Sequence, residues 1–556
     1  MTVAEYISQR IKREKVEYVF GYQGGSVIEI IKSICKASGL NYIQAFHEQA
    51  AGFEADAYSR ITGNFGVCVV TNGPGLTNAI SAIADAYYDF VPMLVLSGQV
   101  KTTDKNNNPK IRQNAFQEVD SVALCSPITK YAKTIPDASV LPEELEKAIR
   151  IAKTPPFGPV LIDIPIDLQK AIVPEASFPD NSLDAPVTDY SSDIAALTDL
   201  LNASSRPVII AGGGIRQGDA YEELCEFASL TGVPVARTLA GLDLITDTDL
   251  GFCGLYGTPA ANKAINQADL LVVLGSRLAK RQVGIPEKYA PRAKVFHADI
   301  NSAELGHVRK EDYSVCTLIK PFLSAANRYF KEKNVKYDFS EWKRTISGYV
   351  DMHSADVEMN SSSPVKPYSI LRRLSSVLPD TATITLDVGQ NQMWCAQGLK
   401  CKKGQRVISS GGLGCMGFSL PAGIGAFYAT GKPIYSFMGD GGSQMNIQEL
   451  QYISSTQIPV KIFIFNNRGL GMIQEVQMKF SDKEYFGSVI GYSTPPYQGL
   501  AETYGIQYIK LCSNDDIEGK DFLTLLENNK PAIIEMNLDC SPMRLLTMYD
   551  NINIYE

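Results

Sequence analysis

The chain alternates short apolar runs with stretches whose apolar residues recur at helical spacing. Residues 434–438 and 460–465 are apolar runs with the length of a buried strand. Between them, Ile447, Leu450 and Ile453 recur at every third position, as on one face of a helix. A strand, a helix and a second strand in this order predict a β-α-β unit, whose crossover makes the two strands parallel.

The same alternation extends along most of the chain. Further strands are predicted at the apolar runs 65–70, 91–96, 160–165, 208–210, 270–274 and 294–296. Strands that alternate with helices are typical of doubly wound parallel sheets. Two polar stretches, one containing Pro174, Pro179 and Pro186 and the other ending at Pro364, are interpreted as linkers. The prediction is an α/β chain of three doubly wound parallel-sheet domains, at residues 1–170, 190–335 and 365–556.

Length, charge and cysteine usage narrow the class of protein. A length of 556 residues suits three or more domains, and a net charge of -8 with a pI near 5.4 gives no electrostatic case for nucleic acid. The 11 cysteines contain no CxxC pair, which favours buried thiols in a reducing compartment. Thr2 and Glu5 fit a helix capping box rather than a signal peptide, and no apolar run could span a bilayer. We therefore expect a cytoplasmic protein that binds neither nucleic acid nor membrane.

Two polar motifs follow the strands of the first predicted β-α-β unit. Residues 439–443 read Gly-Asp-Gly-Gly-Ser, and residues 466–469 read Asn-Asn-Arg-Gly. The carboxyl ends of neighbouring parallel strands meet at the edge where open α/β sheets hold ligands. Oxygen ligands few in number suit Mg²⁺, which completes its octahedron with water and diphosphate oxygens. The alternative is two ordinary strand-to-loop turns.

The pair of motifs resembles the metal-binding motif of thiamine-diphosphate (ThDP) enzymes. That resemblance implies that Asp440, Asn467 and the carbonyl group of Gly469 bind Mg²⁺. ThDP chemistry also needs a carboxyl group, shielded from water, that hydrogen-bonds to the aminopyrimidine ring and promotes deprotonation of the reactive carbon. Glu48 is the candidate, although a glutamate at the start of a helix is usually only a favourable partner of the helix dipole.

Nearly the whole chain resembles the acetohydroxyacid synthase (acetolactate synthase) branch of the ThDP enzymes. The resemblance rests on residues 21–25, 47–49, 72–78, 115–118, 387–394 and 411–417. It implies a pyrimidine-binding domain, a central FAD-binding-like domain and a diphosphate-binding domain. In that family one subunit supplies the glutamate and another supplies the diphosphate site. We therefore expect a homodimer or homotetramer that acts on a small 2-keto acid.

The resemblance also assigns roles around the cofactor. Met416 is expected to lie under ThDP and support its bent conformation, although a lone methionine also serves as a core filler. Gln117 and Phe116 are expected to line the substrate site, and Gly25 to lie in a turn over the reactive ring. Gln390 is expected near the diphosphate. The other expected ThDP contacts are Gly389, Asn391, Gly414, Gly439, Gly441, Gly442, Ser443 and Met472.

The central segment carries a second set of glycine-rich motifs. Residues 212–214 are a triple glycine, which by itself is a weak nucleotide signal. Together with residues 254–258, 275–277 and 297–300 it resembles the FAD-binding domain of the family. In that reading Arg277 meets the phosphates, because a planar guanidinium suits bidentate phosphate binding. The remaining candidate contacts are Gly213, Gly257 and Asp299. The alternative is a different adenine nucleotide, or none.

The resemblance predicts a ThDP-, Mg²⁺- and FAD-containing carboligase. It would decarboxylate pyruvate and transfer the hydroxyethyl unit to a second carbonyl compound. Arg281 matches an arginine that meets the acceptor carboxylate, whereas Val476 stands where the family has a tryptophan that packs on 2-ketobutyrate. The alternatives are simple decarboxylation, for which the paired histidines of pyruvate decarboxylases are missing, transfer to a keto-sugar nucleotide, and a catalytically inactive homologue.

Overall fold

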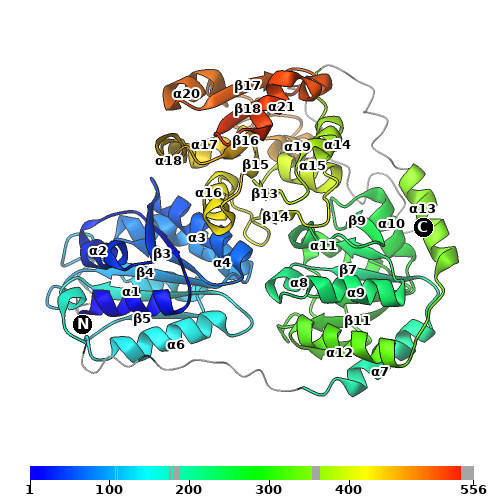
Figure 1. Ribbon diagram of the computed structural model, residues 1–556, viewed down its shortest axis with the longest axis horizontal. Coiled ribbons are helices and arrows are strands. Elements are labelled where there is room, and N and C mark those ends of the chain that lie inside the picture. The colour runs from blue at the N-terminus through cyan, green and yellow to red at the C-terminus, as the bar shows by residue number, and fades with distance from the viewer. Residues whose placement is uncertain (107, 109, 174–177, 179–187, 353–363, 540–556) are drawn as a thin grey trace.

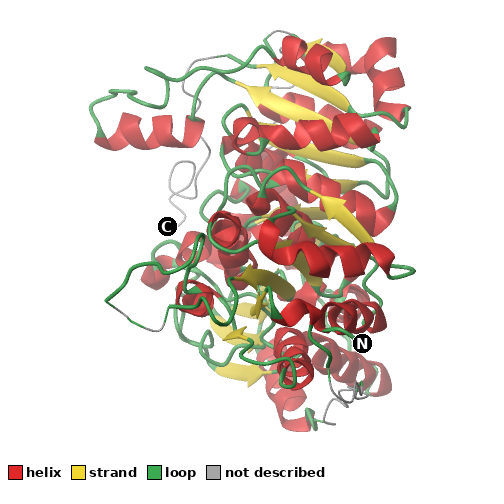
Figure 2. Cartoon of the chain, turned by 90° about the vertical axis from the view of Figure 1, so that its left-hand side faces the viewer, coloured by secondary structure: helices red, strands yellow, loops and turns green. Residues whose placement is uncertain are grey.

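The computed structural model describes residues 1–106, 108, 110–173, 178, 188–352 and 364–539 (Figure 1). These residues form three six-stranded sheets, and every strand pair is parallel. Helices cover both faces of the strands (Figure 2). The predicted class, three doubly wound α/β sheets, is therefore confirmed. The predicted linker positions Pro174, Pro179 and Pro186 lie outside the described residues.

The first unit, residues 1–173, contains the sheet β2-β1-β3-β4-β6-β5. The capping box at Thr2 and Glu5 starts its first helix, as predicted. Its elements are α1 (Val3–Arg13), β1 (Tyr18–Gly21), η1 (Gly25–Val27), α2 (Ile28–Lys36), β2 (Asn41–Gln44), α3 (Glu48–Thr62), β3 (Gly66–Val70), α4 (Pro74–Tyr88), β4 (Met93–Gln99), α5 (Ser121–Cys125), η2 (Ser126–Ile128), β5 (Tyr131–Thr134), α6 (Leu141–Lys153), β6 (Pro159–Pro165) and η3 (Leu168–Lys170).

The central unit, residues 188–352, contains the sheet β12-β11-β10-β7-β8-β9. Trp342 of α13 donates its indole N–H to the carbonyl of Pro207 at 3.1 Å, so packing onto this sheet continues past residue 335. The elements are α7 (Ser191–Asn202), β7 (Pro207–Ala211), α8 (Gly214–Gln217), α9 (Tyr221–Thr231), β8 (Val235–Arg237), η4 (Leu239–Gly241), β9 (Asp249–Phe252), α10 (Pro259–Gln267), β10 (Leu270–Leu274), α11 (Lys280–Val283), η5 (Pro286–Lys288), β11 (Lys294–Asp299), β12 (Tyr313–Cys316), α12 (Ile319–Glu332) and α13 (Ser340–Met352).

The third unit, residues 364–539, contains the sheet β14-β13-β15-β16-β18-β17. Counted within each unit, the strand order 2-1-3-4-6-5 is the same here as in the first unit. The elements are α14 (Pro367–Val377), β13 (Thr383–Leu386), α15 (Gln390–Gly398), β14 (Arg406–Ser409), α16 (Ser419–Thr430), β15 (Ile434–Gly439), α17 (Gly442–Met445), η7 (Ile447–Glu449), α18 (Leu450–Thr456), β16 (Val460–Asn466), α19 (Gly471–Phe480), α20 (Tyr497–Tyr504), β17 (Gln507–Leu511), η8 (Asn514–Glu518), α21 (Lys520–Glu527) and β18 (Ala532–Asn537).

The predicted β-α-β unit is present, but its helix is interrupted. β15 and β16 pair in parallel, and each apolar run named above lies within or overlaps a strand. Between them, α17, η7 and α18 replace one continuous helix. Asn446 breaks the helix with φ -130° and ψ 37°, and its side chain donates to Gly417 O and Gln49 Oε1 instead. The break lies before Ile447, so the predicted helical pattern of Ile447, Leu450 and Ile453 is present in η7 and α18.

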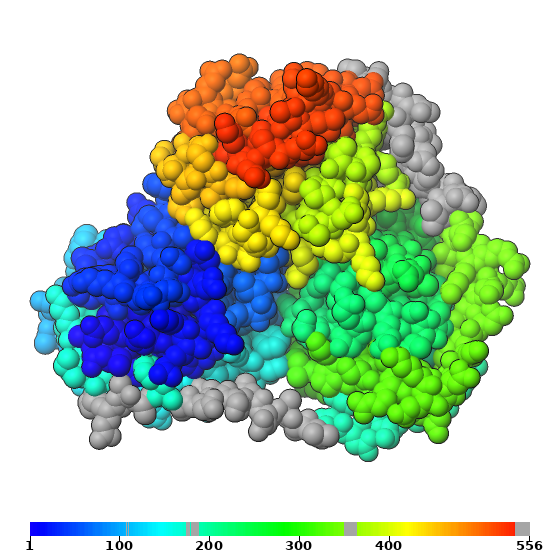
Figure 3. Space-filling model, in the orientation of Figure 1, coloured from blue at the N-terminus to red at the C-terminus, as the bar shows by residue number. Residues whose placement is uncertain are grey.

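The first and third units share one hydrophobic core, in which α3 packs against α16. A Cβ atom at Gly425 of α16 would lie 2.1 Å from the carbonyl oxygen of Glu54 in α3, so only glycine permits this helix crossing. Phe53 and Phe418 pack edge to face beside it, with ring centroids 5.3 Å apart. Figure 3 shows that the third unit lies against the central unit as well as against the first. No described helix is long and apolar enough to cross a membrane.

Candidate active site

The predicted metal ligands meet at the carboxyl edge of the third sheet. Asp440 follows β15 and Asn467 follows β16, and these strands are neighbours in the sheet. With its amide nitrogen turned inward, Asn467 donates to Asp440 Oδ2 at 3.2 Å and to the carbonyl oxygen of Gly469 at 3.0 Å. With the amide oxygen turned inward, Asn467 would present an oxygen at these distances from the other two oxygen atoms. Two adjacent ligands of an octahedral Mg²⁺ at about 2.1 Å are about 3.0 Å apart, so the spacing fits this ion.

The Asp440 carboxylate is shielded from solvent and held in place. The residue is 1% exposed, and burial raises its pKa, although hydrogen bonds oppose the shift. Tyr492 donates to Oδ1 at 2.8 Å, while the carbonyl oxygen of Asp440 accepts from Ser443 Oγ at 2.9 Å. Because a cation favours the ionised carboxylate, a bound Mg²⁺ would oppose the effect of burial. Within the described residues, no group of three His, Cys, Asp or Glu side chains could hold a metal instead.

Glycines at this edge allow close packing against two side chains that are expected to contact ThDP, Asn391 and Gln390. Gly389 adopts φ +147°, and a Cβ atom there would lie 2.6 Å from Asn391 Oδ1. A Cβ atom at Gly439 would lie 3.2 Å from the same oxygen, so Asn391 lies between the ends of β13 and β15. Gly471, which starts α19, approaches so closely that its Cβ would lie 1.9 Å from Gln390 Oε1. Because glycine has no side chain, the backbone at these three positions packs directly against Asn391 and Gln390.

The loop with Met416 lies against the Gly-Asp-Gly motif. A Cβ atom at Gly441 would lie 3.1 Å from Met416 Cε, which places the methionine next to the motif. The carboxylate of Asp387 accepts from Gly417 N at 3.0 Å, and it lies so close to Gly442 that only glycine fits there. Burial raises the pKa of Asp387 to about 6. Sequence reasoning missed this positioning role, although Asp387 begins one of the motifs that carry the resemblance.

Two predicted ThDP contacts of the third unit remain, Gly414 and Met472. Gly414 has φ +77° in the loop before Met416. Met472 lies in the first turn of α19, where its side chain packs against the core of the third unit. Both positions border the diphosphate edge. Contact of Gly414 and Met472 with ThDP stays a prediction.

A second group of candidates gathers in the first unit. Glu48 is the first residue of α3 and is 7% exposed, and its Oε2 accepts from Asn78 Nδ2 of α4 at 2.9 Å. Gly75 lies close to the Glu48 carboxylate, since a Cβ atom there would be 3.4 Å from Oε1. Gln117 lies beside Gly73, and its carbonyl accepts from Asn72 Nδ2 at 3.0 Å. Glu48 and Gln117 thus both lie at the carboxyl edge of the first sheet.

Two other candidates of the first unit face open space. At Gly25 a Cβ atom would meet no atom within 4 Å, which leaves room above the turn. Phe116 is 85% exposed, so in a single chain its ring has little to pack against. Exposed aromatic rings of this kind often mark surfaces that a ligand or a partner covers.

The third unit of the same chain fixes the start of α3. The backbone N–H of Phe46 donates to both carboxylate oxygens of Glu449, at 3.0 and 3.2 Å. Burial raises the pKa of Glu449 to about 8. Asn446 adds a hydrogen bond of 3.1 Å to Gln49. These residues orient the turn that carries Glu48, and no local sequence signal identifies them because their partners lie about 400 positions away.

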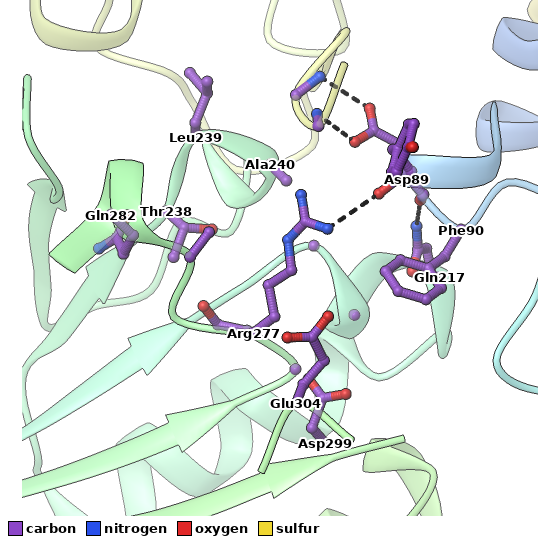
Figure 4. A pocket seen from close by; sticks show the side chains of 18 of the residues that line it. Asp89, Phe90, Gln217, Thr238, Leu239, Ala240, Arg277, Gln282, Asp299 and Glu304 are labelled. Carbon is purple, nitrogen blue, oxygen red and sulfur yellow. Dashed lines mark hydrogen bonds between the residues drawn. The ribbon is translucent and has the colours of Figure 1, made fainter. Parts of the chain in front are cut away.

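A large cavity opens where the three units meet. Its empty space is about 1270 Å³, part of it open to solvent. Gly213, Arg277, Asp299 and Arg281 are among its lining residues, together with Phe90 of the first unit. Figure 4 shows Arg277 reaching across this cavity, with Asp299 and Glu304 below it. Burial raises the pKa of Asp299.

The cavity lies at the point where ligands bind in doubly wound sheets. Counted within the central unit, the strands run 3-2-1-4-5-6, the order of dinucleotide-binding folds. Successive strands are added in one direction from β7 and in the opposite direction from β10, so the topological switch point lies between these two neighbouring strands. The loops that follow β7 and β10 carry Gly213 and Arg277. A guanidinium and close-packed glycines at this position suit a phosphorylated ligand. The site therefore fits a nucleotide cofactor such as FAD.

Three other candidates do not lie where they were expected. Gly257 lies outside the central cavity, and Arg281 and Val476 lie in different units. Gly257 does not line the cavity; it packs into a turn against Gly254 and Cys253, while its neighbour Tyr256 is a lining residue. Arg281 belongs to the central cavity. Val476 lies on α19 of the third unit and is 52% exposed. The two predicted acceptor contacts thus come from different units of the chain.

Comparison with known proteins agrees with this architecture. Three family models match in chain order: the N-terminal TPP binding domain of thiamine pyrophosphate enzymes at residues 1–124, the central domain at 194–326 and the C-terminal TPP binding domain at 387–536. The last range contains the sheet edge with Asp440 and Asn467. The first contains Glu48.

Several curated proteins are similar over almost the full chain. The acetolactate synthase large subunit of Lactococcus lactis is 37% identical, with 96% of this chain and 92% of that protein covered. A probable acetolactate synthase large subunit of Methanocaldococcus jannaschii is 36% identical, with 97% and 92% covered. The large subunit of Escherichia coli acetolactate synthase isozyme 1 is 32% identical, with 97% and 94% covered. The chain therefore belongs to the acetolactate synthase large-subunit family of the thiamine pyrophosphate enzymes.

Proposed function

We propose that this protein is a ThDP- and Mg²⁺-dependent carboligase that decarboxylates pyruvate and transfers the two-carbon unit to a second 2-keto acid. The observation that carries this proposal is the convergence of Asp440, Asn467 and the carbonyl of Gly469 beside a glycine-lined sheet edge. An inactive homologue would have no need to keep this donor set together with a buried Glu48.

The residues of the chain have distinct tasks in this reaction. Bound ThDP would supply the electron sink for loss of CO₂. Asp440, Asn467 and Gly469 would hold Mg²⁺ and through it the diphosphate. Met416, beside Gly441, would support the middle of the cofactor. Glu48 would exchange a proton with the aminopyrimidine ring through its carboxyl oxygens, in a site that excludes water.

We further propose that two copies of the chain complete each site. Glu48 lies at the edge of the first sheet, whereas Asp440 lies at the edge of the third. Large apolar side chains are exposed on the elements that border these edges: Phe116, Ile473, Phe480, Phe486 and Ile490. Apolar surface of this kind is typical of a protein interface. A second copy would cover it and bring its own Glu48 to the diphosphate edge, as the family resemblance implies.

The proposed activity is tested by identifying the products formed from pyruvate. Purified protein with ThDP and Mg²⁺ is expected to release CO₂ and to form acetolactate, which NMR of the reaction mixture detects directly. Acetaldehyde as the main product would instead identify a simple decarboxylase. Product formation only after addition of a keto-sugar nucleotide would identify transfer to that acceptor.

FAD in the central cavity is expected to remain oxidised during turnover. The proposed carboligation is redox-neutral, so no hydride needs to reach the flavin. The visible spectrum, recorded anaerobically during steady-state turnover, measures this. Bleaching in step with product would indicate an oxidoreductase, and freshly purified, active protein without any flavin would remove the FAD assignment.

We expect little preference for 2-ketobutyrate over pyruvate as the acceptor. Valine at position 476 lacks the indole surface that packs on the extra methyl group in the family, and contact with one methylene is worth about 1–3 kcal/mol. When both keto acids compete in one reaction, the ratio of products does not depend on how much of the enzyme is correctly folded. A ratio near unity that rises in Val476→Trp supports the prediction. A strong excess of acetohydroxybutyrate in the unmodified protein contradicts it, and would mean that another side chain fills the gap.

A further inference from the structure

Asp89 lies where the three units of the chain meet. It directly follows α4 and forms the C-cap of that helix. Its carboxylate accepts two backbone hydrogen bonds from the third unit: Gly411 N donates to Oδ2 at 2.9 Å and Gly412 N to Oδ1 at 2.7 Å. Arg60 of α3 also donates to Oδ2, at 3.0 Å. One side chain of the first unit thus fixes the loop that leads to Met416.

The backbone next to this carboxylate contacts the central unit. The carbonyl oxygen of Asp89 accepts from Gln217 at the end of α8, and the carbonyl oxygen of Tyr88 accepts from Arg277 Nη1 at 3.4 Å. Figure 4 shows both contacts together with the two hydrogen bonds to the loop. Arg277 and Gln217 line the central cavity. The same two residues, Tyr88 and Asp89, therefore contact the nucleotide cavity on one side and the Met416 loop on the other.

The loop is shaped for this contact. A Cβ atom at Gly412 would lie 2.9 Å from Asp89 Oδ1 and from the carbonyl oxygen of Tyr88, so only glycine lets the loop approach. Behind it, Ser410 Oγ donates to Asp85 Oδ1 at 2.5 Å and accepts from Cys415 N at 2.8 Å. Met416 follows directly. The position of the methionine beside Gly441 thus depends on carboxylates of the first unit.

We propose that Asp89 is a positioning residue that couples the central cavity to the ThDP site, so that a nucleotide bound in the cavity tightens ThDP binding. A phosphate that engages Arg277 restrains the side chain that contacts Tyr88, and restraint of residues 88–89 orders the loop at Gly411 and Gly412. Binding energy then need not be spent on ordering the loop when ThDP arrives. The inference rests on the proposed function, since it requires that the protein binds ThDP and a flavin nucleotide.

Asp89→Asn is the informative substitution. An amide keeps the shape of the carboxylate, but it offers one acceptor oxygen and one NH₂ group, so it cannot accept from Gly411, Gly412 and Arg60 together. ThDP affinity is measured by calorimetry on full-length, cofactor-free protein, with and without saturating FAD. In the unmodified protein we expect FAD to tighten ThDP binding about tenfold, within the usual range of coupling between sites. In Asp89→Asn we expect this factor to fall below about twofold.

Two further measurements separate positioning from general loss of structure. Hydrogen exchange of the peptide 410–416 is expected to slow when FAD binds, and to stay fast in Asp89→Asn. Gly412→Ala, which pushes the loop away from Tyr88, is expected to lose the coupling in the same way. Asp219→Asn is the matched control, because Asp219 is an exposed carboxylate of the central unit that pairs with Lys320; it should keep the full factor.

The outcomes distinguish this inference from the proposed function. If ThDP and FAD both bind but FAD changes ThDP affinity equally in the unmodified protein and in Asp89→Asn, Asp89 does not couple the sites. The same holds if FAD has no effect on either protein. If the unmodified protein does not bind FAD, the cavity assignment and this inference fail together, while ThDP binding and acetolactate formation still test the function.

Discussion

Glu48→Gln is expected to slow proton exchange at the reactive carbon of bound ThDP by about 10²–10⁴-fold, the usual contribution of a general acid or base. The amide has nearly the shape of the carboxyl group and can still accept from Asn78, so folding and ThDP affinity should change little. What it cannot do is exchange a proton with the aminopyrimidine ring. Deuterium exchange at the reactive carbon, followed by NMR after acid quench, measures the effect without any dependence on later steps.

Glu54→Gln provides the matched control for this experiment. Glu54 lies on the same helix and is also buried, and burial next to Glu449 raises its pKa well above the ordinary value. Because burial favours the neutral form of this carboxyl group, its replacement by a neutral amide should be tolerated. The exchange rate should therefore fall in Glu48→Gln only. If the rate is unchanged in Glu48→Gln, Glu48 has no part in proton transfer.

Asp440→Asn should weaken Mg²⁺ binding, and with it ThDP binding, by about 100-fold or more. Even residues that only support metal ligands typically contribute about 10–100-fold, and Asp440 would contact the ion directly with its charge. The measurements are Mg²⁺ titration of ThDP binding and of activity, with expected partial rescue by excess metal and cofactor. The double variant Asp440→Asn/Asn467→Asp returns one negative charge to the ligand set, so we expect it to recover part of the lost affinity.

The opposite result would remove the metal assignment. If Asp440→Asn protein keeps its activity after extensive chelation and without added Mg²⁺, the three converging oxygens do not hold a catalytic ion. A loss of activity that no amount of Mg²⁺ or ThDP relieves, in protein that binds both normally, would give Asp440 a different role.

Mixing the two inactive variants tests the shared site. If Glu48 and Asp440 act from different subunits, a mixed dimer of Glu48→Gln and Asp440→Asn chains has one intact site and one doubly altered site. Random exchange at equal amounts then restores about a quarter of the unmodified activity. No recovery after verified subunit exchange would mean that each chain builds its own complete site.

The elements, and the chemistry that depends on neighbouring strands, could be predicted from the sequence. Runs such as Leu270–Leu274 are buried on both faces, because helices cover a parallel sheet on each side, and their continuous apolar pattern shows this directly. Asp440 and Asn467 could be paired for a related reason. Each follows a recognisable strand of one β-α-β unit, and the crossover rule brings the ends of such strands to the same edge.

The contacts between segments far apart in the sequence could not be predicted and are known only from the structure. Edge strands such as β2 and β17 are partly exposed, so their local pattern is weak. The contacts of Asp89 with Gly411 and Gly412, and of Glu449 with Phe46, join residues more than 300 positions apart. A hydrophobic pattern reports how one segment is buried, whereas such contacts depend on how whole units pack. The orientation of Glu48 and the support of Met416 follow from that packing, and no local motif encodes either.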